Sequence, residues 1–329
     1  MSEELRLPFS PATKQEWLDK IREDLKGKKS PEEFLVETEG ILIDPFVTGE
    51  ESNHAILPLD RMMETLSEGV YFNISHAEND RKRLLRFLET GASSIFLHLT
   101  KDIDPAVLLD GVHLDYIFTF IHTDSRETAR QFIKYVELTY PDKGLNIFIC
   151  VNHVAVFPEK TLFFDINISQ DITGSLTRVL QQVKPAILAD KPDRCIFHCT
   201  IGKNFLWSVS ALRALRILWE NIVSDAGFEG DIPAIVACLP ANNELSSDHN
   251  QALIELSYST LAANLGNADI FYTDFPGPDP HDIYKLRAFL IQQVFREEGK
   301  LPLVKDPVAG SFYVEQVTRK IAEKVWENL

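Results

Sequence analysis

The chain has 329 residues, of which 45% are hydrophobic and 25% charged, so it can form a packed core and is not a disordered protein. Its 49 Asp and Glu residues outnumber 33 Lys and Arg, giving a formal net charge of −16 that disfavours nucleic acids and anionic membrane surfaces as partners. No apolar stretch approaches the roughly 20 residues that cross a bilayer, and no secretory signal is visible. Four cysteines do not make a disulfide framework, so we expect a cytoplasmic protein.

The N-terminal segment differs from the rest of the chain. Apolar residues recur at helical spacing within residues 15–26, which predicts a helix there. Residues 38–58 are rich in turn-forming residues and predict irregular structure. We therefore expect residues 1–58 to form an arm that contacts another subunit, and residues 59–329 to form the folded domain.

From residue 70 onward, short apolar runs alternate with longer amphipathic segments. Most runs are apolar throughout, which is typical of parallel strands covered on both faces. The eight runs comprise residues 70–75, 94–99, 116–121, 146–152, 162–168, 194–201, 232–239 and 269–275. Helical periodicity is found in residues 80–89, 125–138, 204–223, 251–265, 284–296 and 313–326.

Eight strands alternating with helices predict an α/β fold of the (β/α)8 or TIM-barrel type, with a doubly wound open sheet as the alternative. One connection departs from this pattern. Only about ten residues, 153–161, separate the fourth and fifth strands, which is too short for a crossover helix. Either that helix is lost or two of the strands form a hairpin.

The sequence lacks the common catalytic motifs. It contains no P-loop, no Rossmann glycine motif, no zincin motif and no nucleophile elbow. Cys195, His198 and Cys199 lie close together, but zinc needs further ligands, and on a strand His198 faces away from the two cysteines. We therefore predict no metal site.

Polar residues follow several of the predicted strands. His98, His122 and His153 lie at or just beyond strand ends, where the active sites of barrels gather. Histidine there is suited to proton transfer or ligand binding, although it also bonds backbone carbonyls in a purely structural role. Asp165 and Asp274, near other strand ends, form a weaker candidate pair for acid–base chemistry.

The sixth strand is followed by Gly202, Lys203 and Asn204, which open the strongest predicted helix. A glycine turn at a helix N-terminus is suited to an anion, and Lys203 adds positive charge. The same residues also serve as an ordinary helix cap.

Two segments resemble signatures of the methylmalonyl-CoA mutase family. I-G-K-N-F-L-W-S-V-S-A-L-R-A-L-R-I-L-W at residues 201–219 resembles G-x-N-F-F-x-E-x-A-K-L-R-A-x-R-x-L-W. D-P-V-A-G-S-F-Y-V-E-Q-V-T at residues 306–318 is similar to D-P-x-G-G-S-Y-Y-V-E-x-L-T. Residues 9–28 and 38–41 are similar to the family's small, or beta, subunit. The resemblance implies a barrel fold and the isomerisation of methylmalonyl-CoA and succinyl-CoA with adenosylcobalamin.

The chain departs from the catalytic pattern of that family at four places. The cobalt-ligating motif D-x-H-x-x-G is absent, and the nearest string, residues 279–282, lacks the glycine. Residues 165–172 align with the segment that reads S-I-S-G-Y-H-M-Q in catalytic subunits, but they lack its G-Y-H triplet. Residues 237–243 align with the family motif R-T-H-S-Q-T-S-G and differ from it. R-Q-Y-A-G-F-S-T has no counterpart around residues 55–75. The resemblance therefore implies a non-catalytic small subunit without catalytic residues or a cofactor of its own.

That role implies a heterodimer with a catalytic large subunit, in which adenosylcobalamin belongs to the complex. Arg194 aligns with a family arginine that contacts CoA. The candidate substrate-binding residues are Arg194, Lys203, Asn204, His122 and Gln170.

One alternative is a catalytic acyl-CoA mutase barrel that works with a separate cobalamin-binding protein. Another is an unrelated barrel enzyme that uses the strand-end histidines on a small acid or sugar. The barrel centre is either open or filled by side chains such as Phe163, Phe197 and Phe271.

Overall fold

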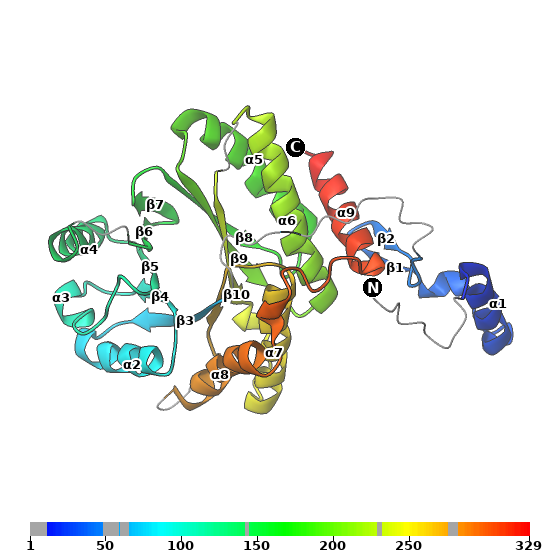
Figure 1. Ribbon diagram of the computed structural model, residues 1–329, viewed down its shortest axis with the longest axis horizontal. Coiled ribbons are helices and arrows are strands. Elements are labelled where there is room, and N and C mark those ends of the chain that lie inside the picture. Colours follow the sequence, from blue (N-terminus) through cyan, green and yellow to red (C-terminus); the bar gives the residue numbers. More distant parts are fainter. Residues whose placement is uncertain (1–11, 49–58, 60–65, 142–144, 229–231, 276–281) are drawn as a thin grey trace, which may run out of the picture.

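The computed structural model describes residues 12–48, 59, 66–141, 145–228, 232–275 and 282–329 (Figure 1). Its centre is a barrel-like sheet in which eight strands run parallel to one another. These are β3 (Ser67–Ile74), β4 (Ser94–Leu99), β5 (Phe118–Thr123), β6 (Ile147–Val151), β8 (Thr161–Asn167), β9 (Arg194–Ile201), β10 (Ala234–Pro240) and β11 (Ile270–Thr273). All eight overlap the strands predicted from apolar runs.

The strands follow one another around the sheet in the order β7-β6-β5-β4-β3-β11-β10-β9-β8. Each neighbouring pair is parallel except β6 and β7, and the first strand, β3, pairs with the last, β11. The two end strands, β7 and β8, also lie against each other, so the sheet is nearly closed. The predicted TIM-barrel-like fold is confirmed, and the open doubly wound sheet is not.

The short connection between the fourth and fifth parallel strands is a hairpin without a helix. β7 (Val154–Phe157) pairs antiparallel with β6 through a two-residue turn. The turn residues Asn152 and His153 have φ values of 47° and 63°, a left-handed conformation that Asn and His adopt more readily than most residues. The crossover helix is therefore lost, as predicted, and the fourth strand pairs with an additional short strand instead of with the fifth.

Helices cover the outside of the barrel. They are α2 (Ala77–Glu89), α3 (Pro105–Leu108), α4 (Arg126–Thr139), α5 (Ile172–Asp190), α6 (Phe205–Asp225), α7 (His249–Leu265), α8 (Ile283–Glu297) and α9 (Phe312–Trp326). The sequence did not predict α3, which is one turn long, or α5. Pro185 lies inside α5 and obscures it, yet five buried apolar residues of α5 recur at helical spacing: Ile172, Leu176, Leu180, Val183 and Ile187. No helix in the described ranges is both long and apolar enough to cross a membrane.

The N-terminal segment begins with the predicted helix, α1 (Lys14–Leu25), which Thr13 caps through a capping box. No residue of α1 is buried, and the helix lies away from the barrel (Figure 1). A 3-10 helix, η1 (Pro31–Phe34), follows it.

Next in the chain is a hairpin of β1 (Val36–Thr38) and β2 (Ile41–Ile43), whose turn residues Glu39 and Gly40 have positive φ. Ile41 and Ile43 are buried in the outer core beside α9. Irregular structure was therefore the wrong expectation for this part of residues 38–58, while residues 49–58 lie outside the described ranges.

Candidate functional site

Aromatic side chains fill the centre of the barrel. Phe120 of β5 lies 6.2 Å, centroid to centroid, from Tyr272 of β11 and 5.9 Å from Phe163 of β8, which are strands on other sides of the barrel. Phe96 of β4 and Phe148 of β6 complete this layer at 5.7 Å and 5.1 Å from Phe120. All five side chains are buried, so the barrel interior is a packed core.

The sequence suggested three phenylalanines that could fill the barrel centre, and of these only Phe163 faces the interior. Phe197 and Phe271 belong to the outer core under the helices, where Phe197 packs edge-on against Trp219 of α6 at 5.3 Å. Strand alternation explains the difference. Phe163 and Phe197 lie on adjacent strands, but their side chains point to opposite faces of the sheet.

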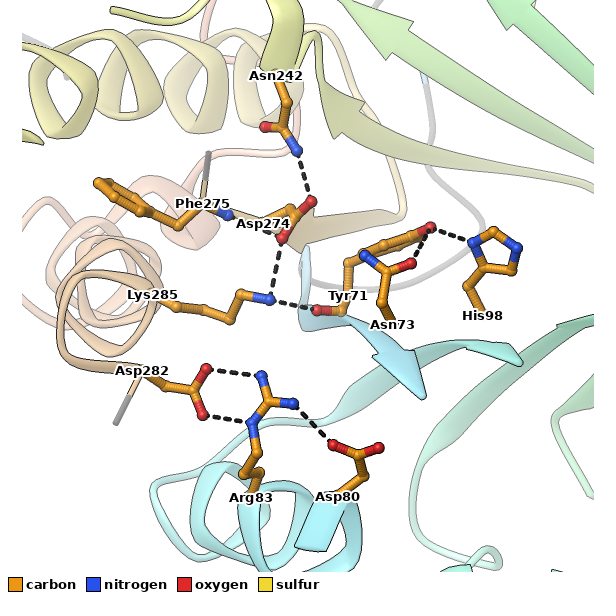
Figure 2. Close-up of polar contacts among 10 residues, drawn as sticks. All are labelled: Tyr71, Asn73, Asp80, Arg83, His98, Asn242, Asp274, Phe275, Asp282 and Lys285. Carbon is orange, nitrogen blue, oxygen red and sulfur yellow. Dashed lines mark hydrogen bonds and ion pairs between the residues drawn. The ribbon is translucent and has the colours of Figure 1, made fainter. Parts of the chain in front are cut away.

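Above the aromatic layer, the carboxyl ends of the strands carry a row of imidazoles. The rings of His98 and His122 are 4.9 Å apart, and the ring of His153 follows at 4.9 Å from His122. Tyr71 of β3 extends the row, with its hydroxyl 2.9 Å from His98 Nδ1 (Figure 2). The structure thus brings together the three strand-end histidines seen in the sequence. His153 reaches the row because the β6–β7 turn takes the place of a crossover helix.

Asp165 on β8 contacts two histidines near the carboxyl ends of the strands, which we call the mouth of the barrel. Its carboxylate accepts hydrogen bonds from His153 Nδ1 at 2.5 Å and from His198 Nδ1 at 2.8 Å. Burial opposes ionisation of Asp165, but the hydrogen bonds and charges of His198 and His153 outweigh it and hold the pKa of this carboxyl below its usual value. His198 is buried and stacks on Phe96 at 5.0 Å, whereas 68% of the His153 side chain is exposed.

The two histidines in the middle of the row resist protonation. Burial lowers the pKa of His98, and nearby His153 adds to the effect. Burial also lowers the pKa of His122, and the neighbouring His98 and His153 lower it further. Both side chains are therefore neutral near pH 7.

A second polar group occupies the other side of the mouth, between β3, β11 and α8 (Figure 2). Lys285 Nζ lies 3.0 Å from the Asp274 carboxylate and donates to the Tyr71 carbonyl at 2.9 Å. Asn242, after β10, donates to the other oxygen of Asp274 at 2.5 Å. Asp165 and Asp274 thus have separate partners, and neither contacts the other among the described hydrogen bonds.

Beside this group, Arg83 of α2 forms ion pairs with Asp282, at the start of α8, and with Asp80 (Figure 2). The pair with Asp282 is bidentate, with both nitrogen–oxygen distances at 2.7 Å. The Asp282 pKa is lowered, because these contacts with Arg83 outweigh the effect of burial. The remaining residues of the 279–282 string, 279–281, lie outside the described ranges.

The five candidate substrate-binding residues do not form one site. Arg194 lies at the amino end of β9, with its guanidinium 5.6 Å from the Phe148 ring, and so at the opposite end of the barrel from His122. Lys203 is 3.5 Å from Glu255, and Gln170 donates to Glu244 at 3.3 Å. The exposed Asn204 precedes α6 without a side-chain capping bond. Of the five, only His122 lies in the imidazole row.

The two signature segments contact each other. Arg213 of α6 is fully buried and binds both oxygens of Asp306, at 2.7 and 2.6 Å, and Glu315 of α9 at 2.8 Å. Arg216 binds Asp269 at 2.7 Å and the carbonyl of Asn267. These residues join helices to the barrel and lie in the outer layer. Sequence reasoning missed this role, although two arginines within an otherwise apolar helix were a usable signal.

The Cys195, His198 and Cys199 side chains do not converge on one point. In the part of the chain that the structure describes, no group of three or more His, Cys, Asp or Glu side chains is placed to hold a metal ion. Cys195 and Cys199 are buried in the outer core, whereas His198 faces the interior, as strand alternation requires.

Residues 186–329 match the family model described as "Methylmalonyl-CoA mutase". The predicted resemblance is confirmed. A methylmalonyl-CoA mutase small subunit from Porphyromonas gingivalis is 23% identical over 99% of this chain and 63% of its own length. A methylmalonyl-CoA mutase from Cereibacter sphaeroides is 29% identical over 49% of this chain and 24% of that protein. A small subunit from Propionibacterium freudenreichii subsp. shermanii is 30% identical over 41% of this chain and 22% of its own length.

The chain thus spans less than two thirds of each of these relatives of the methylmalonyl-CoA mutase family. A solved structure, Yersinia pestis DHPS with a pterine-sulfa conjugate, is similar over 80% of this chain at 12% identity and a TM-score of 0.37. That score is too low to support a conclusion about function.

Proposed function

We propose that this chain is the barrel of a methylmalonyl-CoA mutase small subunit that supports a catalytic large subunit and is itself catalytically silent. The match to a small subunit over 99% of the chain supports this role. So do the departures at residues 165–172 and 237–243 from the segments that the family resemblance assigns to catalysis.

The packed barrel centre is the observation that carries the proposal. The family resemblance implies that an acyl-CoA passes along the barrel axis to reach the catalytic centre. Here Phe120 touches side chains from several other strands across that axis, and its own exposed fraction is 1%. A pantetheine chain needs continuous space that this aromatic layer occupies.

The described residues offer no cobalt-ligating site of the kind that the family resemblance assigns to D-x-H-x-x-G. That motif does not occur in these 329 residues, and the described histidines at the strand ends contact one another. We propose that in the heterodimer the cofactor binds to the catalytic subunit. The arm at residues 1–58 is the proposed contact, since α1 has no buried residue and its Trp17 stacks only on Phe46 of the same arm among the described ring contacts.

Isothermal titration with methylmalonyl-CoA tests whether the barrel is closed to substrate. We expect no heat of binding at high ligand concentration. Micromolar binding that Arg194→Ala abolishes would instead favour a catalytic barrel working with a separate cobalamin-binding protein. Lys320→Ala is a suitable control, because Lys320 bonds the Leu42 carbonyl on the outer surface.

Reconstitution tests the supporting role. A methylmalonyl-CoA mutase large subunit from the same organism is mixed with adenosylcobalamin and with this chain, and its thermal midpoint and mutase activity are measured. We expect both to rise with added chain and the chain alone to be inactive. Mutase activity of this chain with a cobalamin-binding domain, and no large subunit, would overturn the proposal.

A further inference from the structure

The barrel has one seam that is not closed by the backbone. Within the described residues, every neighbouring pair of barrel strands is joined by ladder hydrogen bonds except β7 and β8, which end the strand order. These two strands only lie against each other. A sheet edge without ladder bonds separates more readily than a paired one, because fewer interactions must break.

The two ends of this seam are held differently. At the amino end of β8, only residues 158–160 connect β7 to β8, so the strands cannot move far apart there. At the mouth, His153 in the β6–β7 turn donates to Asp165 on β8 at 2.5 Å, which is a contact across the seam. Asp165 is held in turn by buried His198 on β9, at 2.8 Å.

We propose that the β6–β7 hairpin is a hinged flap in the barrel wall, tethered through residues 158–160 and fastened at the mouth by the His153–Asp165 contact, which we call the latch. When the latch breaks, the β7 side of the hairpin moves away from β8 at the mouth, while β6 stays paired with β5. The inner face of β6, with Cys150 and Phe148, then becomes accessible from the seam.

Thiol labelling reports the opening directly. The chain is treated with N-ethylmaleimide at neutral pH, and the labelled cysteine is located by peptide mass spectrometry. Cys150 reports the flap, whereas the buried Cys195, Cys199 and Cys238 lie in the outer core and report global unfolding. We expect Asp165→Asn to raise the labelling rate of Cys150 about tenfold and leave the other three unchanged, because a charge-assisted hydrogen bond is lost locally.

His153→Asn is the second variant, since Asn keeps the left-handed turn but removes the imidazole. Asp110→Asn is the matched control, because Asp110 forms an exposed ion pair with Arg81 away from the seam. Unchanged labelling of Cys150 in both latch variants would overturn the proposal. Equal acceleration at all four cysteines would also overturn it, because the barrel would then be unfolding as a whole.

Discussion

At the residue scale, the most informative side chain is Arg213. It lies in the longer signature segment and its fully buried guanidinium binds Asp306 and Glu315 of the other. The two most recognisable stretches of the sequence are thus joined by a buried ion network that supports the fold. In this chain the two signature segments therefore contribute to the stability of the fold.

Replacing Arg213 tests this structural role. Arg213→Ala leaves Asp306, which is also buried, without its cation, and we expect a loss of about 3–5 kcal/mol in the free energy of unfolding. Urea denaturation followed by circular dichroism measures it. Arg178→Ala, which removes an exposed pair with Asp171, is expected to cost less than about 1 kcal/mol. Equal losses in the two variants would contradict the assigned role.

At the element scale, the hairpin of the N-terminal segment stabilises a barrel helix. The Glu39 carboxylate accepts hydrogen bonds from the backbone N–H groups of Ile172 and Thr173 at 2.7 and 2.8 Å, and from the Thr173 hydroxyl at 2.8 Å. These are the first residues of α5, where a negative charge also interacts favourably with the helix dipole. An acidic residue far away in sequence therefore caps α5 from outside the barrel.

We expect Glu39→Gln to lower the free energy of unfolding by about 1–2 kcal/mol, because the substitution removes the charge at this cap. Hydrogen exchange of the first turn of α5, followed by mass spectrometry, is the local measurement and should become faster. Glu37→Gln, an exposed change on the same hairpin, is the control and should stay within about 0.5 kcal/mol. Unaltered exchange in Glu39→Gln would show that the cap is dispensable.

At the scale of the whole molecule, the barrel is built around two cores. The outer core lies between strands and helices, and the inner core is the aromatic layer on the axis. The side chains of the inner core pack against one another across the axis, so each of them contributes to the closure of the barrel.

Truncating a side chain of the inner core should therefore lower the free energy of unfolding substantially. Phe120→Ala removes the central ring of the layer, and we expect a loss of about 3–5 kcal/mol from burial and the cavity left behind. Phe34→Ala removes a partly exposed ring of η1 and should cost about 1 kcal/mol or less. Thermal unfolding compares the two. If Phe120→Ala lowered the free energy of unfolding no more than Phe34→Ala does, the barrel axis would not be packed.

The imidazole row gives the whole molecule a dependence on pH. The folded state holds the pKa of His98 and His122 below the usual value of 6.5, so the unfolded chain binds these protons first. Their stabilising contribution is complete above about pH 6.5 and declines as pH falls from there toward their folded pKa. The carboxyl of Asp165, whose pKa is also lowered, acts in the same direction but only below about pH 4.

We expect the urea midpoint to be lower at about pH 5.5 than at about pH 7.5, and the double variant His98→Gln, His122→Gln to show a smaller drop. His113→Asn, an exposed change outside the row, should retain the full drop. If the double variant lost stability with acid as steeply as the native sequence, the row would not be the source.

Much of the fold could be predicted from the sequence because it depends on local pattern. Apolar runs such as residues 94–99 and 194–201 predict buried parallel strands, and each is a barrel strand. The short segment after the fourth strand excluded a crossover helix on length alone. Helix α5 was missed because Pro185 interrupts its pattern, although the helix tolerates that residue within its nineteen residues.

The candidate site was predictable only in part. The strand-end positions of His98, His122 and His153 follow from the strand assignment, and parallel strands bring such ends to one edge. Arg194 shows the limit of that reasoning, since it begins β9 and so lies at the opposite edge from the carboxyl ends of the strands. Gln170 and Lys203 are each engaged by a glutamate from a different element, which no local pattern indicates.

The sequence by itself determined the fold class, the lost crossover helix and the family resemblance, since strand length, apolar spacing and signature order are local properties of the chain. Only the tertiary structure decided what the barrel contains and how it closes. His153 and His198 lie 12 and 33 positions from Asp165, and they meet it because the hairpin and β9 flank the same strand. Such contacts depend on which face each strand turns inward and on the order of strands around the barrel.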